Sequence, residues 1–209
     1  MNTKKSLYAT LEDRLNLKKG LPITPDWSAA PDFMTLIVEH ALATQPATIF
    51  ECSSGLTTLM LARCCQMNGQ GHLYSLENGP EYAANTRSYF KRYGLDDYAT
   101  VIYAPLENMA HNDDEFLWYS PDEIPAHIPA QSIDMVVIDG PPGFIQKNSR
   151  YPALPQLFDL LADGCTIFLD DAVREDEKRI VALWLAEYPR LEHQYIDAER
   201  GCSILTVSR

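Results

Sequence analysis

The chain has 209 residues, of which 46% are hydrophobic and 22% are charged, and its formal net charge is −12. A chain of this length fits one domain that buries a hydrophobic core without disulfides. The acidic balance argues against a protein that grips nucleic acid through its phosphates or binds an anionic membrane surface, because both need a clustered basic face.

The first 44 residues are predicted to form a helical extension in front of the main domain. Helices are expected over 6–18 and 32–44, with a proline-rich loop between them. We therefore divide the chain into a helical cap, 1–44, and a main domain, 45–209. The cap could cover a ligand site or pair with a second copy of the chain, so a homodimer is one expected assembly.

Beyond the cap, strands and helices alternate. Strands are predicted at 47–52, 72–77, 99–104, 133–138, 165–169, 191–197 and 202–208. Helices are predicted at 57–67, 80–92, 153–162 and 174–188. Such alternation specifies a mainly parallel sheet with helices on both faces, and the short polar link at 199–201 predicts an antiparallel final pair. The predicted fold class is α/β, a Rossmann-like, doubly wound sheet of seven strands whose last strand is antiparallel.

A long connection at 107–131 interrupts the alternation. It follows the carboxyl end of a predicted strand, where parallel sheets bind ligands, and long connections in compact domains are often functional. The segment is rich in acidic residues and contains the aromatic run 116–119. Two interpretations stay open: a lid or wall of a substrate site, and an ordinary surface insertion.

All five cysteines are predicted to be reduced and buried. Their number is odd, no Cys-x-x-Cys pair is present, and four of the five fall in predicted strands or an apolar helix. This usage is typical of a cytoplasmic protein. No signal peptide is expected, and no segment approaches the roughly 20 apolar residues of a membrane span.

Three predicted strands end in an acidic residue followed by a turn, at Glu51, Glu77 and Asp139. Because the carboxyl ends of parallel strands meet at one edge of a sheet, these side chains are expected to line one crevice. Glu77 follows Glu51 by 26 positions, a separation typical of a nucleotide-binding unit with a ribose carboxylate. Two carboxylate oxygens match the vicinal hydroxyls of a ribose, whereas the alternative role for Glu77 is capping of the next helix.

Small residues, Cys52-Ser53-Ser54-Gly55, form the turn after the first strand. They allow the backbone to approach a ligand closely, and the following helix offers free N–H groups. The Gly-x-Gly-x-x-Gly pattern that cradles a pyrophosphate is missing, so the turn suits a ligand without a diphosphate. The candidate cofactor-binding residues of these two turns are Glu51, Ser53, Ser54, Gly55, Thr57, Glu77 and Asn78.

Carboxylates also end the fourth and fifth predicted strands, at Asp139, Asp170 and Asp171. Together they could bind a hard divalent cation, hold a substrate amine, or include a general base. Capping of the next helix is the alternative for Asp171. Arg150 could pair with a substrate carboxylate or phosphate, or form a surface salt bridge.

The order and spacing of three segments, Ile49–Glu107, Ile133–Gly143 and Gly164–Asp171, resemble the class I S-adenosylmethionine-dependent methyltransferases. The loop Asp139–Gly143 and the segment Asp26–Pro31 look closest to a methyltransferase-24-like bacterial branch, with a more distant similarity to catechol O-methyltransferase. The resemblance therefore implies S-adenosylmethionine as cofactor and methyl transfer to an oxygen or nitrogen of a small molecule.

The same resemblance implies roles for individual residues. Glu77 would hold the ribose, and residues 104–106, ending at Leu106, would lie over the adenine. Asp139 would contact the cofactor and act as the base or an orienting carboxylate, with Asp171 as the second catalytic candidate. The implied substrate contacts are Trp27, Arg150 and Tyr151, and the implied Mg²⁺ ligands are Asp139, Asp170 and Asp171.

The sequence departs from the family pattern at two places. Ser53 and Ser54 occupy positions where the family usually has glycine, and Asp171 stands where the catechol enzymes have Asn. Two further readings stay open: an aminopropyltransferase on the same scaffold, and a non-catalytic cofactor-binding protein with a degenerate glycine turn. A nicotinamide oxidoreductase is disfavoured by the missing glycines.

Overall fold

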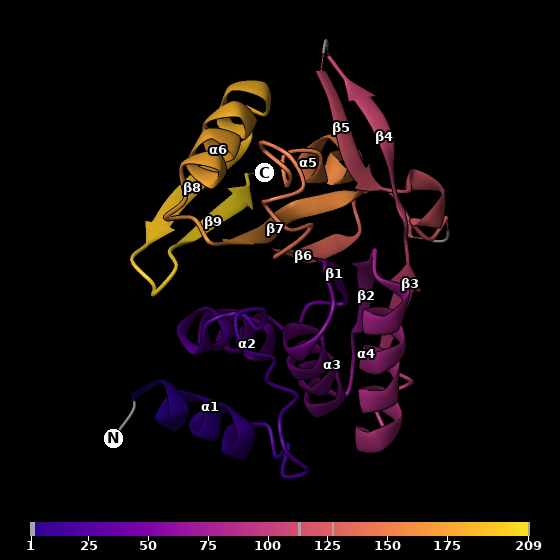
Figure 1. Ribbon diagram of the computed structural model, residues 1–209, viewed down its shortest axis with the longest axis vertical. Coiled ribbons are helices and arrows are strands. Elements are labelled where there is room, and N and C mark those ends of the chain that lie inside the picture. The colour runs from indigo at the N-terminus through magenta and orange to yellow at the C-terminus, as the bar shows by residue number, and fades with distance from the viewer. Residues whose placement is uncertain (1–2, 113, 127, 209) are drawn as a thin grey trace.

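The computed structural model describes residues 3–112, 114–126 and 128–208, and a seven-stranded sheet runs through its centre (Figure 1). The strand order is β3-β2-β1-β6-β7-β9-β8. Neighbours from β3 to β7 are parallel, whereas β9 is antiparallel to β7 and to β8. The strands are β1 (Thr48–Cys52), β2 (His72–Glu77), β3 (Ala99–Tyr103), β6 (Ile133–Ile138), β7 (Leu161–Asp170), β8 (Leu191–Ile196) and β9 (Cys202–Val207). The Rossmann-like fold class with an antiparallel last strand is confirmed.

The central strands are nearly continuous apolar runs, as burial on both faces of a parallel sheet requires. Residues 49–52 of β1 and 135–138 of β6 are all buried. By contrast, β8 lies at the edge of the sheet, and four of its six residues are exposed. The hydrophobic pattern thus places β1 and β6 side by side at the centre, where the strand order changes direction and parallel sheets bind ligands.

Helices cover both faces of the sheet (Figure 1). On one side lie α1 (Thr3–Arg14), α2 (Pro31–Thr44), α3 (Leu56–Asn68) and α4 (Pro80–Tyr93), and on the other lie α5 (Ala153–Leu157) and α6 (Glu175–Glu187). The helix expected over 153–162 is shorter, because a 3-10 turn at Phe158–Leu160 follows α5 and β7 already begins at Leu161. The first helix also ends earlier than expected, at Arg14.

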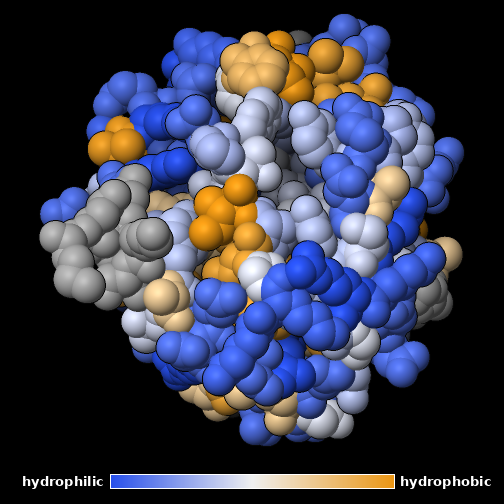
Figure 2. Space-filling model, turned by 60° about the horizontal axis from the view of Figure 1, so that its bottom comes forward, coloured by the Kyte–Doolittle hydropathy of each residue, from blue (hydrophilic) through white to orange (hydrophobic). Residues whose placement is uncertain are grey.

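A separate hydrophobic cluster lies on each face. Leu11 and Phe33 from the amino-terminal segment pack in one cluster with Leu59 of α3 and the underside of the sheet. Trp184 of α6 packs in the other cluster with Phe50 of β1. Hydrophilic residues cover most of the face in Figure 2, and its hydrophobic residues form small separate groups. In the described part of the chain, no helix combines the length and apolar character needed to traverse a membrane.

The segment after β3 forms a β-hairpin that the sequence did not predict. Its strands are β4 (Leu106–His111) and β5 (Asp114–Tyr119), and a short 3-10 helix, Pro121–Glu123, follows. The hairpin stands on the same side of the sheet as α5 and α6, over the half formed by β1, β2 and β3 (Figure 1). It therefore takes the covering position that a helix usually occupies in a crossover between parallel strands.

Candidate active site

The carboxyl ends of the central strands open into a cavity of about 1180 Å³. The structure brings most of the candidate residues to this one cavity, although they come from distant parts of the chain. Those that line it are Trp27, Ser53, Ser54, Gly55, Thr57, Glu77, Asn78, Asp139, Arg150 and Asp171. Glu51 and Asp170 are fully buried at the ends of β1 and β7.

Two further candidates, like Glu51 and Asp170, lie outside the lining of the cavity. Tyr151, expected at the substrate, donates its hydroxyl hydrogen to Oε1 of Glu187 at 2.6 Å, and its ring contacts Phe116 of the hairpin. Because Arg150 points toward the carboxylates, its neighbour Tyr151 points into the core instead. Leu106, expected over the adenine, is paired with Tyr119 in the hairpin, and it is Tyr119 that lines the cavity.

The turn after β1 keeps a glycine-type backbone despite its serines. Gly55 has φ = +141° and Ser53 has φ = +126°, a region that residues with a Cβ rarely adopt. The conformation is held because the Ser53 N–H donates to the Leu76 carbonyl at 3.0 Å, and the Ser75 hydroxyl donates to the Ser53 carbonyl at 2.5 Å. Ser53 is therefore held in a conformation that favours glycine, at a turn that lines the cavity.

We expect Ser53→Gly to stabilise the protein by about 1 kcal/mol, because relief of roughly 1–3 kcal/mol of backbone strain outweighs the greater conformational entropy that glycine gives the unfolded chain. Urea unfolding measures this difference. The matched control is Ser54→Gly, which should be destabilising because the Ser54 hydroxyl donates to Oε2 of Glu77 at 2.7 Å. A Ser53→Gly protein less stable than the native one would contradict the strain assigned here.

Glu51 lies at the bottom of the turn with no exposed surface. The Thr57 hydroxyl donates to its Oε1 at 2.5 Å, while Oε2 has no hydrogen-bond partner among the described residues. Burial raises the pKa of Glu51 to about 7, and hydrogen bonds from Thr57, Thr58 and Ser75 oppose this rise. A buried carboxyl group with a raised pKa therefore lies directly behind the turn that follows β1.

The raised pKa predicts a pH-dependent stability. Between pH 4.5 and about pH 7, the folded protein binds more protons at Glu51 than the unfolded chain does, so the free energy of unfolding falls as pH rises through this range. Glu51→Gln removes the titrating group, so its free energy of unfolding should not fall in this way. We expect the variant to gain about 3 kcal/mol relative to the native protein between roughly pH 5 and pH 8, at 1.36 kcal/mol for each pKa unit. Urea unfolding across this range, with Glu192→Gln on the exposed edge strand as control, tests it. Parallel pH profiles of the Glu51→Gln and native proteins would refute it.

Glu77 ends β2 and reaches the cavity with 8% of its surface exposed. Its Oε1 accepts a hydrogen bond from the Gly79 N–H at 2.8 Å, and its Oε2 accepts one from the Ser54 hydroxyl at 2.7 Å. Burial raises its pKa, and these hydrogen bonds oppose the rise. Backbone N–H groups of Ser54 and Asn78 also favour the charged form, so the carboxylate is fixed in the lining of the cavity, where hydroxyl groups of a ligand can reach it.

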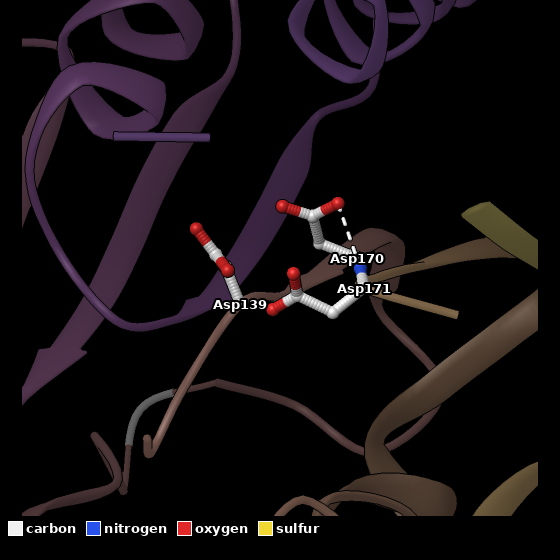
Figure 3. A group of neighbouring side chains, drawn as sticks. All are labelled: Asp139, Asp170 and Asp171. Carbon is white, nitrogen blue, oxygen red and sulfur yellow. Dashed lines mark hydrogen bonds between the residues drawn. The ribbon is translucent and has the colours of Figure 1, made fainter. Parts of the chain in front are cut away.

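Three carboxylates meet where β6 and β7 end. One oxygen from each of Asp139, Asp170 and Asp171 lies within 4.8 Å of the others. Figure 3 shows the Asp171 side chain extending toward Asp139, while Asp170 folds back to accept the Asp171 N–H at 2.8 Å. Burial, and then the charge of Asp170, raises the pKa of Asp139 well above its usual value, and burial raises the pKa of Asp170 to about 6.

Arg150 is the buried cation of this cluster. Its Nη2 donates to Oδ2 of Asp171 at 2.9 Å and to the Asp139 carbonyl at 2.7 Å, and its Nη1 donates to the Asp170 carbonyl at 2.9 Å. Burial lowers its pKa, but the neighbouring carboxylates outweigh burial and hold it above the usual value. Arg150 thus forms a buried ion network with the protein's own carboxylates and not a surface salt bridge, while its role at a substrate stays a prediction.

The sequence analysis did not identify several residues of the site. Glu177 in the first turn of α6 lies 3.7 Å from Nη1 of Arg150 and lines the cavity, and Arg174 lies 2.9 Å from Oδ2 of Asp171. Phe144 meets Trp27 at the rim in an edge-to-face contact, with ring centroids 6.2 Å apart. Acidic residues are common at the start of a helix, where they interact favourably with the helix dipole. The contact of Glu177 with Arg150 could therefore be recognised only from the fold.

The sequence was compared with protein families and with curated proteins. Residues 52–172, more than half of the chain, match a family described as methyltransferase domain. No curated protein matches the chain significantly.

Solved structures share the fold at low sequence identity. The O-methyltransferase from Bacillus cereus in complex with SAH is 19% identical, with a TM-score of 0.68 over 97% of this chain and 91% of that chain. The SAM complex of the O-methyltransferase TomG from Streptomyces achromogenes is 14% identical, with a TM-score of 0.66 over 97% and 89% of the two chains. The SAH-bound methyltransferase PaMTH1 from Podospora anserina is 16% identical, with a TM-score of 0.65 over 97% and 88%. The strand order of the present chain and its match to the family together show that it belongs to the methyltransferase-domain family of class I S-adenosylmethionine-dependent methyltransferases.

Proposed function

We propose that this protein transfers the methyl group of S-adenosylmethionine to an oxygen or nitrogen of a small molecule. The observation that carries the proposal is the shared cavity of Glu77, the Ser53–Gly55 turn and Asp139. The Glu77 carboxylate at the end of β2 can accept hydrogen bonds from the hydroxyl groups of a ribose. The turn at Ser53–Gly55 allows a ligand without a diphosphate to approach the backbone closely. The ligands of the Bacillus cereus and Streptomyces achromogenes structures support this assignment.

When bound, the cofactor supplies a methyl group on a positively charged sulfur, which is a good leaving group. The protein then needs to align the acceptor atom with that methyl group and, where required, receive a proton. Asp139 lies in the cavity, where it could orient the acceptor or take its proton, and burial raises the pKa of its carboxyl group, which makes the carboxylate a stronger base. Trp27 and Phe144 at the rim offer apolar contacts to the acceptor molecule.

Calorimetry with S-adenosylhomocysteine, followed by assays of methyl transfer to a panel of phenols and amines, tests the proposal. We expect saturable binding and formation of S-adenosylhomocysteine from the donor with at least one acceptor class. Absence of binding would favour the non-catalytic protein, and preference for the decarboxylated donor would favour aminopropyl transfer.

We further propose that Mg²⁺ binds Asp139, Asp170 and Asp171. Hard oxygen ligands suit Mg²⁺, and Oδ2 of buried Asp170 has no hydrogen-bond partner among the described residues. Arg150 and Arg174 already contact Asp171, so the cation would share this carboxylate with them. Bound there, Mg²⁺ would supply a positive charge for orienting an acceptor oxygen.

At a hundredfold excess over the dissociation constant, Mg²⁺ should stabilise chelator-treated protein by about 2.7 kcal/mol, a rise in Tm of roughly 5–10 °C for a domain of this size. Asp170→Asn should abolish most of this rise, whereas Glu175→Gln, at an exposed position on α6, should keep it. An unchanged Tm with millimolar Mg²⁺ or Mn²⁺ would exclude the metal site.

A further inference from the structure

Tyr119 is the last residue of β5 and reaches the cavity from the hairpin. Only 1% of its surface is exposed, so the side chain is held in the wall of the cavity. Its ring packs edge-on against Trp118, with ring centroids 5.0 Å apart. The hairpin, which covers the sheet, therefore also contributes a phenol to the ligand site.

The hydroxyl of Tyr119 lies at the ends of β1 and β6. A Cβ atom placed on Gly140 would lie 2.6 Å from this hydroxyl and 3.0 Å from Cβ of Ser53, so the site needs glycine at 140 to leave room for the phenol. Within residues 3–112, 114–126 and 128–208, the hydroxyl makes no hydrogen bond. Because Tyr119 lines the cavity, a ligand bound there can supply a partner for this hydroxyl.

Three contacts fix the position of Tyr119 before any ligand binds. Tyr119 pairs with Leu106 across the hairpin, and the N–H of the next residue, Ser120, donates to the Pro105 carbonyl at 2.9 Å. The amide group of Gln146 holds the free edge of β5, accepting from the Leu117 N–H at 2.7 Å and donating to the Leu117 carbonyl at 3.0 Å. A rigidly placed donor loses little entropy when it binds.

The location of Tyr119 indicates which part of the methyl donor it meets. The hairpin stands over the half of the sheet that ends in Glu77, the residue assigned to the ribose. Arg150 and Asp139 also act on the Tyr119 hydroxyl, but less strongly than Glu77 does, and Asp170 and Asp171 lie at the end of β7, toward the other half of the sheet. Burial, followed by the nearby Cys52 and Glu77, raises the pKa of Tyr119 well above 10, so the phenol stays a neutral donor. A neutral donor suits the uncharged ring nitrogens and ribose oxygens of a nucleoside.

We propose that Tyr119 donates a hydrogen bond to the nucleoside part of the methyl donor, an assignment that rests on the proposed function. Tyr119 is thus a cofactor-binding residue outside the strand-end turns.

Tyr119→Phe removes only the hydroxyl. Calorimetry should show binding of S-adenosylhomocysteine about three- to tenfold weaker than in the native protein, as expected for one hydrogen bond. The same factor should appear with 5′-methylthioadenosine, which lacks the amino-acid end of the cofactor. The Tm without ligand should be unchanged or higher, because the hydroxyl has no partner to lose.

Tyr93→Phe is the matched control, since the Tyr93 hydroxyl donates to the Gly20 carbonyl at 2.8 Å, outside the cavity. It should lower Tm without changing affinity. Native affinity in Tyr119→Phe would overturn the proposal, as would an effect confined to S-adenosylhomocysteine and absent with 5′-methylthioadenosine. If the native protein itself bound neither compound, the proposed function would fail instead, so the two failures are distinguishable.

Discussion

The Glu77→Ala protein is expected to bind S-adenosylhomocysteine at least about a hundredfold more weakly than the native protein. Two hydroxyl groups of a ribose can donate to this carboxylate, and hydrogen bonds to a charged group contribute roughly 1.5–3 kcal/mol each. The carboxylate is already held by Gly79 and Ser54, so it binds without rearrangement. Isothermal calorimetry at one pH measures the effect.

Two comparisons make this test specific to the ribose. Glu81→Ala, in the exposed first turn of α4, removes a charge of the same sign nearby and should leave affinity unchanged. With a 2′-deoxy analogue of the ligand, the penalty for Glu77→Ala should shrink, because one of the two hydroxyl partners is gone. An equal penalty for both ligands would disprove the ribose assignment.

The Arg150→Met protein is expected to be about 3–5 kcal/mol less stable than the native protein, the usual cost of leaving buried charges without their partner. Met keeps most of the volume of the side chain but removes the charge and the donors. Asp139, Asp171 and Glu177 then remain buried without their cation. Urea unfolding near neutral pH should show the loss, and it should shrink in acid as these carboxylates take up protons.

Arg174→Met is the matched comparison for Arg150→Met. Arg174 also contacts Asp171 at 2.9 Å, but 49% of its side chain is exposed, so solvent screens the pair. We expect it to cost less than about 1 kcal/mol. Equal losses from the two substitutions would mean that burial of Arg150 adds nothing to its role.

The strands that form the site could be predicted because their sequence pattern is strong. β2 and β6 lie at the expected 72–77 and 133–138, since each is an apolar run that ends at an acidic residue or just before one. The order of Glu51, Glu77 and Asp139 along the chain was then enough to place their strand ends at one cavity or directly behind it.

The hairpin could not be predicted from hydrophobicity alone. In β4 only Met109 is buried, so the strand lacks the alternating pattern that identifies a half-buried strand. A weaker signal was present at its turn, where Asn112 adopts φ = +53°, a conformation that Asn tolerates well. The ion pairs of Arg150 with Asp171 and Glu177 could not be predicted either, because these residues come from three separate parts of the chain that meet only in the folded protein.

The pairing of β1 with β6 has a consequence for synthesis on the ribosome. These neighbours are separated in the chain by positions 53–132, so one edge of β1 has no partner until β6 emerges. At about 5–20 residues per second, that interval lasts roughly 4–16 s. During this time an apolar strand with unpaired backbone groups can join a neighbouring nascent chain, so the yield of folded protein should depend on chaperones that shield it.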